Sequence, residues 1–131
     1  VIVGFPTETE EEFIECVEFC KLVGFSKIHV FPYSKREGTK AANMDGQISN
    51  DIKKDRARRL IKIDEELQLK YNQKFIGKTV NVLIEEIEKN MSIGHTENFL
   101  KVEINQTLEP NKTYTITINK IYNDKVIGKL D

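Results

Sequence analysis

The hydrophobic pattern of this 131-residue chain changes its period once, near Lys74, and this change limits the fold more than any other feature. Before Lys74, two long stretches repeat their apolar residues every three or four positions, as amphipathic helices do. After it, apolar residues form short runs separated by turn-forming residues, which is typical of small β-domains. The sequence therefore predicts an α/β domain over 1–72 followed by an all-β domain over 73–131.

Two apolar runs near the N-terminus are predicted as parallel strands. Residues 1–5 form one run and residues 25–31 form the other, and a proline follows each of them. The first run is continuous, which is typical of a strand that is buried on both faces. With a helix between them, the two strands would form a right-handed βαβ unit.

The helix between these runs has a start signal and a stop signal. Thr9 lies three residues before Glu12, the spacing of a capping box, and Gly24 is placed to end the helix. The apolar positions at helical spacing are Phe13, Cys16, Val17, Cys20 and Val23. Because no third cysteine or histidine follows at a suitable spacing, the two thiols are predicted to be core residues and not metal ligands.

A loop without periodicity follows over 32–49, and loops of that length are usually functional. A second helix is predicted from Asp51 to Tyr71, because one apolar face runs through it. The apolar positions of this helix are Ile52, Leu60, Ile63, Leu67 and Tyr71. The basic block in its first half consists of Lys53, Lys54, Arg56, Arg58 and Arg59. We expect this block to be mainly a solvated face, with contact to phosphate groups as the alternative.

The second domain is predicted to be a small barrel. Its β-like runs cover 79–87, 99–104, 113–121 and 125–130. The clearest turns between them are expected at 92–94 and 109–111. Four or five short antiparallel strands in so small a domain favour a barrel of the oligonucleotide-binding type, because closure removes exposed edges.

Polar and charged residues gather where the two parallel strands end. The turn over 4–9 offers backbone amides that could hold an anion or a polar cofactor. The second strand ends at 31–39, where Tyr33 contributes an aromatic face and Arg36 a planar guanidinium for phosphate or carboxylate. Because parallel strands end on one side of a sheet, we expect both segments to line one site.

The segment 94–101 is a second candidate site. It brings an imidazole, a hydroxyl, an amide, an aromatic ring and an ammonium group to one predicted hairpin, a set that suits single-stranded RNA. With no acid or nucleophile expected near His95, the sequence argues against a catalytic role for this histidine.

The charge of the chain limits the partners that it can attract. It has 20 basic and 21 acidic residues, so any contact with nucleic acid has to come from a local basic face. No apolar run is long enough to cross a membrane and no signal peptide is present, so we expect a cytoplasmic protein. The sequence begins inside a strand-like apolar run, Val1 to Pro6, without an initiator methionine, which predicts that the chain is a piece of a longer protein.

Three stretches, 2–13, 30–42 and 94–102, together resemble the C-terminal part of a radical S-adenosylmethionine methylthiotransferase. The third is most similar to the branch that acts on threonylcarbamoyladenosine in tRNA. The resemblance implies that the first domain is the end of a radical S-adenosylmethionine barrel, a partial TIM-like barrel, and that residues 73–131 are a TRAM domain. It also implies an enzyme that adds a methylthio group to C2 of the modified adenosine next to the anticodon, using two 4Fe–4S clusters and S-adenosylmethionine.

Site residues follow from the resemblance position by position. Those that match the strand flanking the adenine of S-adenosylmethionine are Ile2, Gly4 and Phe5. Those that match a motif near the substrate are Tyr33, Ser34, Arg36, Gly38 and Thr39. The RNA-binding residues predicted in the TRAM-like segment are His95, Thr96, Asn98 and Lys101.

Two departures from the family pattern matter. Thr7 stands where the family commonly has glycine, and a threonine is expected to keep φ below zero in this turn. The family binds its clusters with a C-x-x-x-C-x-x-C motif and three further cysteines, whereas this chain has only Cys16 and Cys20. We therefore expect no metal ligand and no catalytic residue here, and no activity from this chain alone.

The partners that the resemblance implies are tRNA, bound at its anticodon region through the TRAM domain, and the N-terminal domains of the same polypeptide. Exposed strand edges of an incomplete barrel would also favour self-association. Two alternatives stay open: a small RNA-binding or adaptor protein in its own right, and a methylthiotransferase that acts on a ribosomal protein.

Overall fold

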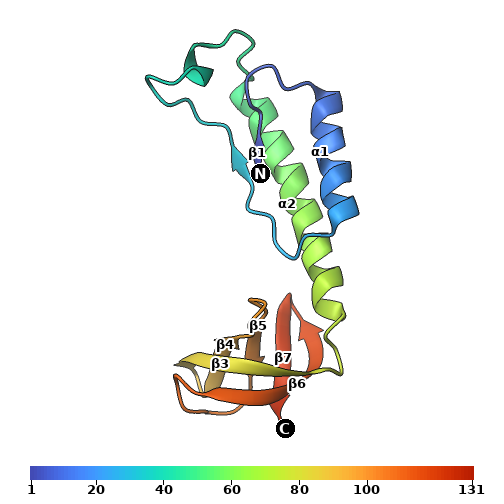
Figure 1. The fold of residues 1–131 in the computed structure, drawn as a ribbon, viewed down its shortest axis with the longest axis vertical. Coiled ribbons are helices and arrows are strands. Elements are labelled where there is room, and N and C mark those ends of the chain that lie inside the picture. Colours follow the sequence, from blue (N-terminus) through green and yellow to red (C-terminus); the bar gives the residue numbers. More distant parts are fainter. The chain divides into compact units, whose positions relative to one another are not determined.

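The structure, a computed structural model, describes all 131 residues and divides into two units, Val1–Gln68 and Leu69–Asp131 (Figure 1). Each unit has an apolar core of its own. The prediction of an α/β unit followed by a β-barrel unit is confirmed. The assignment of the first unit to a radical S-adenosylmethionine barrel stays a prediction, because this unit contains only a two-stranded sheet.

That sheet is shorter than the sequence predicts. Strand β1 (Ile2–Val3) pairs in parallel with β2 (Phe31–Pro32). The prediction of a strand over 25–31 was wrong for residues 25–30. The reason is visible at Ile28, whose N–H donates to the Asp64 carboxylate at 2.7 Å and not to a neighbouring strand. Burial of the first strand on both faces was also wrong, because Val3 is buried but Ile2 is 58% exposed.

Helix α1 (Glu10–Val23) begins and ends where the sequence predicts. The Thr9 hydroxyl accepts a hydrogen bond from the Glu12 N–H at 3.1 Å, so the predicted cap is confirmed. Gly24 ends the helix in the left-handed conformation, with a φ of 70°. Phe13 is fully buried, whereas Val23, which was predicted on the apolar face, is half exposed at the last helical position.

Helix α2 (Asn50–Gln73) is slightly longer than predicted. Its residues Leu60 and Leu67 pack with α1 in the first core, but Ile52 in the first turn is exposed, so its assignment to the apolar face was wrong. The preceding loop contains one short 3₁₀ turn, Ala41–Asn43. Neither α1 nor α2 combines the length and the apolar character that a bilayer span requires.

The second unit is a closed five-stranded barrel with the order β3-β4-β5-β7-β6. The strands are β3 (Thr79–Glu88), β4 (Met91–His95), β5 (Lys101–Ile104), β6 (Thr113–Tyr122) and β7 (Lys125–Leu130). An all-antiparallel barrel was predicted, but β5 and β7 are parallel. Closure leaves the barrel without a free edge, so the edges predicted to favour self-association can lie only in the β1–β2 sheet.

Strand β4 was missed, because residues 92–94 were predicted to form a turn. The turn lies earlier, at Lys89 and Asn90, which have φ values of 50° and 65°. Ser92 is fully buried, and its hydroxyl donates to the Gln106 carbonyl and accepts from the Leu108 N–H. Gly94 allows a close approach of strands: a Cβ there would lie 2.1 Å from the carbonyl oxygen of the facing strand β3.

Candidate functional site

A cavity of about 440 Å³ lies where β1 and β2 end in the first unit. The predicted site residues among its lining are Ile2, Tyr33, Ser34, Arg36 and Thr39. The convergence expected from the parallel strands occurs only in part, because Ile2 and the segment after β2 line the cavity but no residue of the turn over 4–9 does. Phe31 adds an apolar wall beside Ile2, and the volume lies within the range of small-molecule sites.

The polar groups of this cavity are only partly used within the chain. The Thr39 hydroxyl donates to the Arg36 carbonyl at 2.7 Å, which holds the loop in place. The Arg36 guanidinium forms no ion pair. The Tyr33 hydroxyl is buried without a hydrogen-bond partner, while its ring contacts Phe5 edge to face at 5.4 Å. The site thus combines an apolar wall with a guanidinium that forms no ion pair.

Gly4 and Phe5 do not line this cavity, and three backbone amides of the turn over 4–9 are bonded within the chain. The N–H of Gly4 donates to the Glu8 carboxylate at 2.9 Å, and the N–H of Glu8 donates to the Phe5 carbonyl at 3.0 Å. The N–H of Thr7 donates to the Gly46 carbonyl at 2.9 Å. These three amides were expected to be available to a ligand, and each is already bonded within the chain.

Thr7 has a φ of 73°, so the prediction of a negative φ was wrong. The loop holds the turn in this conformation, because the bond from Thr7 to Gly46 fixes its amide. Gly46 has no side chain at the contact, and a Cβ there would lie 2.9 Å from the Thr7 methyl group. A β-branched residue rarely adopts this conformation, and it persists here because its surroundings determine it.

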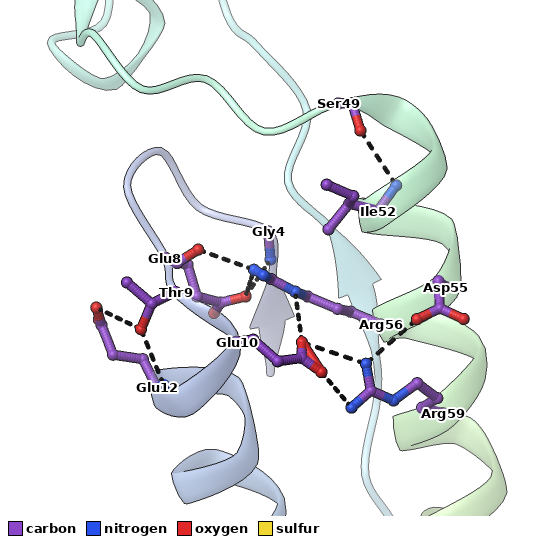
Figure 2. A network of polar contacts seen from close by, with 10 residues as sticks. All are labelled: Gly4, Glu8, Thr9, Glu10, Glu12, Ser49, Ile52, Asp55, Arg56 and Arg59. Atoms are coloured by element: carbon purple, nitrogen blue, oxygen red, sulfur yellow. Dashed lines mark hydrogen bonds and ion pairs between the residues drawn. The ribbon is translucent and has the colours of Figure 1, made fainter.

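Ion pairs connect this turn to α2 (Figure 2). Arg56 is 5% exposed, and its Nη1 donates to Glu8 Oε1 at 2.7 Å and to the Glu8 carbonyl at 3.0 Å. Arg59 contacts both Glu10 and Asp55. The hydrogen bond from Arg59 lowers the pKa of the Glu10 carboxylate below its usual value. The basic block was expected to be a solvated face, but these arginines form internal ion pairs.

A second cavity, of about 580 Å³, lies on the barrel. His95 and Thr96 line it, together with Phe99, which is 87% exposed. Glu85 also lines it, and its carboxylate lies 2.6 Å from Nδ1 of His95. The expectation that His95 has no acidic neighbour was therefore wrong, because the pairing of β3 with β4 brings Glu85 beside it.

The remaining predicted RNA-binding residues do not line this cavity. The Asn98 side chain accepts from the Thr96 hydroxyl and donates to the Tyr71 hydroxyl at 2.8 Å, so it holds the hairpin. Lys101 lies on β5, where it pairs in register with His95 of β4. Phe99 supplies the aromatic ring that the sequence predicted for RNA binding in 94–101, although it was not named among the individual binding residues.

No group of three or more histidine, cysteine or acidic residues is arranged to hold a metal ion in the chain. Cys20 is buried and Cys16 is partly buried on the packed face of α1. Two thiols in this position do not fit an iron–sulfur cluster, which needs further cysteine ligands.

The chain is similar to methylthiotransferases of several kinds. It is 45% identical over 107 residues to the threonylcarbamoyladenosine tRNA methylthiotransferase MtaB of Bacillus subtilis, covering 78% of this chain and 24% of that protein. It is 44% identical over 98 residues to a tRNA-2-methylthio-N(6)-dimethylallyladenosine synthase of Caldicellulosiruptor saccharolyticus, covering 73% of this chain and 21% of that protein.

A third relative modifies a different kind of substrate. The chain is 38% identical over 132 residues to the ribosomal protein uS12 methylthiotransferase RimO of Desulforamulus reducens, covering 82% of this chain and 30% of that protein. The chain thus spans less than a third of the length of each of these relatives. No protein-family model matches it.

Proposed function

The chain belongs to the methylthiotransferase family, and from this premise we propose that it is part of an enzyme that adds a methylthio group to threonylcarbamoyladenosine in tRNA. The extent of the matches supports this choice of nucleoside. Matches to two enzymes named for threonylcarbamoyladenosine extend over 107 and 132 residues. Matches to dimethylallyladenosine synthases extend over 88 to 98 residues.

In this proposal the cavity of the first unit holds the adenosine part of S-adenosylmethionine. Ile2 and Phe31 offer an apolar wall for an adenine ring, and Arg36 offers a polar contact. S-adenosylmethionine and two 4Fe–4S clusters would supply the methyl and sulfur chemistry. The two thiols of this chain do not fit a cluster, so residues outside it would hold both clusters and this chain alone would be inactive.

The barrel, as a TRAM domain, would bind the anticodon region of the RNA at the cavity beside His95. The exposed ring of Phe99 offers a stacking surface for an unpaired base. The paired side chains of Glu85 and His95 offer an acceptor and a donor to the edge of that base. Small barrels commonly recognise single-stranded RNA with this combination of a ring and polar groups.

Binding of the chain to an anticodon stem-loop tests this proposal. We expect tighter binding when the RNA carries threonylcarbamoyladenosine than when it carries unmodified adenosine. Phe99→Ala should weaken binding by about 1 to 3 kcal/mol, the range for removing a base–aromatic stack, and Phe99→Tyr should restore it. Phe19→Ala is the matched control, because Phe19 is also exposed but lies on α1.

A ribosomal protein substrate is the second candidate, supported by the 38% identity to the uS12 methylthiotransferase over 132 residues. Purified uS12 in the same binding assay separates the two. Binding to uS12 without binding to RNA would refute the tRNA proposal in favour of this one. Binding to neither would refute substrate binding by this chain.

A further inference from the structure

The basic block of α2 divides into two kinds of residue. Its three arginines form ion pairs with carboxylates of the first unit, as Arg56 does with Glu8. Its two lysines, Lys53 and Lys54, take part in no ion pair of the chain, and neither does Lys35 in the loop before α2. The positive charge of the three lysines is therefore not neutralised by ion pairs within the chain.

These lysines surround a cavity of about 410 Å³. It is lined by Lys35, Lys53 and Lys54 together with Ser34 and Asn50, and no carboxylate is among its lining residues. The lysines come from two segments, since Lys35 follows β2 and the other two lie in the first turns of α2. The cavity thus offers three ammonium groups, a hydroxyl and an amide to one ligand.

One of the three lysines is held in place. The ammonium of Lys53 donates to the Tyr33 carbonyl at 3.1 Å and lies 5.6 Å from the centre of the Tyr33 ring. Its aliphatic stem passes over Gly4, where a Cβ would lie 2.3 Å from Cγ of Lys53. Gly4 therefore makes room for this lysine, and the ammonium loses little additional conformational entropy when a ligand binds.

We propose that this cavity binds a phosphodiester group of the RNA backbone. The inference rests on the proposed function, since it takes RNA as the ligand. Lysine binds phosphate as a point charge, and contacts to phosphate provide most of the sequence-independent affinity for nucleic acid. Tyr33 and Ser34 line both this cavity and the 440 Å³ cavity beside Ile2, so the bound phosphate would position the strand next to that site.

The test compares two double variants of the chain that lose the same charge. Lys35→Gln/Lys54→Gln removes two ammonium groups from the cavity and leaves the anchored Lys53 in place. Lys62→Gln/Lys70→Gln removes two exposed ammonium groups that form no ion pair, further along α2, and serves as the control. Binding to the anticodon stem-loop is measured between about 0.05 and 0.5 M salt, the range over which phosphate binding makes affinity depend strongly on salt.

We expect the cavity variant to lower the slope of log K against log salt by about 0.7 to 0.9 for each phosphate group that it no longer neutralises. If the cavity variant and the unsubstituted chain bind equally at 1 M salt, the loss of one such phosphate contact makes the variant bind about five- to eightfold more weakly than the unsubstituted chain at 0.1 M salt. The control should keep the slope of the unsubstituted chain. Equal slopes for the two variants, with RNA binding intact, would overturn the phosphate site and leave the proposed function standing.

A titration with inorganic pyrophosphate separates this inference from the proposed function if the unsubstituted chain binds no RNA. Amide NMR shifts at Ser34, Asn50 and Lys53 that disappear in the cavity variant would support the phosphate site while the proposed function fails. No shift at these residues would overturn the site as well. Circular dichroism at 222 nm confirms that both variants keep their helices.

Discussion

The buried ion pair between Arg56 and Glu8 is expected to hold the first unit together. The two side chains are 6% and 16% exposed, and their atoms lie 2.7 Å apart. Arg56→Met removes the charge but keeps an aliphatic side chain over the Phe13 ring. The guanidinium carbon of Arg56 lies 5.8 Å from the centre of that ring. The variant leaves the Glu8 carboxylate with the Gly4 N–H as its remaining partner.

The cost of this change follows from the burial of the pair. Removing one partner of a buried ion pair costs about 3 to 5 kcal/mol. Because Glu8 is partly exposed, we expect the unfolding free energy to fall by about 3 kcal/mol. A unit the size of Val1–Gln68 has an unfolding free energy of roughly 3 to 10 kcal/mol, so the variant should lose a third or more of it.

Urea denaturation followed by circular dichroism at 222 nm measures this loss, because α1 and most of α2 belong to the first unit. Arg58→Met is the matched control: the side chain is 79% exposed, so the unfolding free energy should change by less than about 0.5 kcal/mol. The double variant Glu8→Gln/Arg56→Met should be more stable than Arg56→Met, because no charge is then left unpaired. A loss under about 0.5 kcal/mol for Arg56→Met, or a less stable double variant, would refute this reasoning.

Three further outcomes are expected. Cys16 should react with a thiol reagent in the folded chain, whereas Cys20, whose burial raises the pKa of its thiol, should react only on unfolding; equal rates would contradict this packing. Gly94→Ala should destabilise the barrel by at least about 2 kcal/mol, because the new Cβ would lie 2.1 Å from a backbone oxygen, and unchanged NMR dispersion and urea stability would contradict it. Because the pKa of Glu10 is lowered in the folded chain, its ion pair with Arg59 contributes stability that is fully present above about pH 4.5 and is lost as the pH falls through the pKa of the folded state. The urea midpoint of the first unit should therefore drop in acid, and Arg59→Gln should reduce that drop.

Features that depend on neighbours in the chain could be predicted from the sequence. The start of α1 depends on Thr9 and Glu12, which are three residues apart, and its end depends on Gly24 alone. The alternation of apolar and polar residues over 114–119 likewise indicates the buried side of β6, since Ile116 and Ile118 are fully buried. These signals act within one turn or one strand, so distant contacts do not override them.

Features that depend on distant partners could not be predicted. The N–H of Ile28 bonds to a carboxylate 36 positions further along the chain, so an apolar run that reads as a strand is not one. Gly94 reads as a turn residue, but it is required by the close approach of β3. For the candidate site, the parallel-strand rule brought Ile2 and Tyr33 together, yet the role of Gly4 depends on Lys53, which lies 49 positions later.

The net charge of the chain does not describe how its charges are distributed. The formal net charge of −1 suggests that no strong positive field exists. Arginine presents a planar fork that matches carboxylates, and in this unit Arg56 and Arg59 pair with Glu8 and Glu10. Lysine is a compact point charge without that fit, and the lysines around the 410 Å³ cavity have no such partners. A nearly neutral chain therefore has a cavity lined by three lysines without ion-pair partners, so the proposed phosphate site depends on which carboxylates are already paired and not on the net charge.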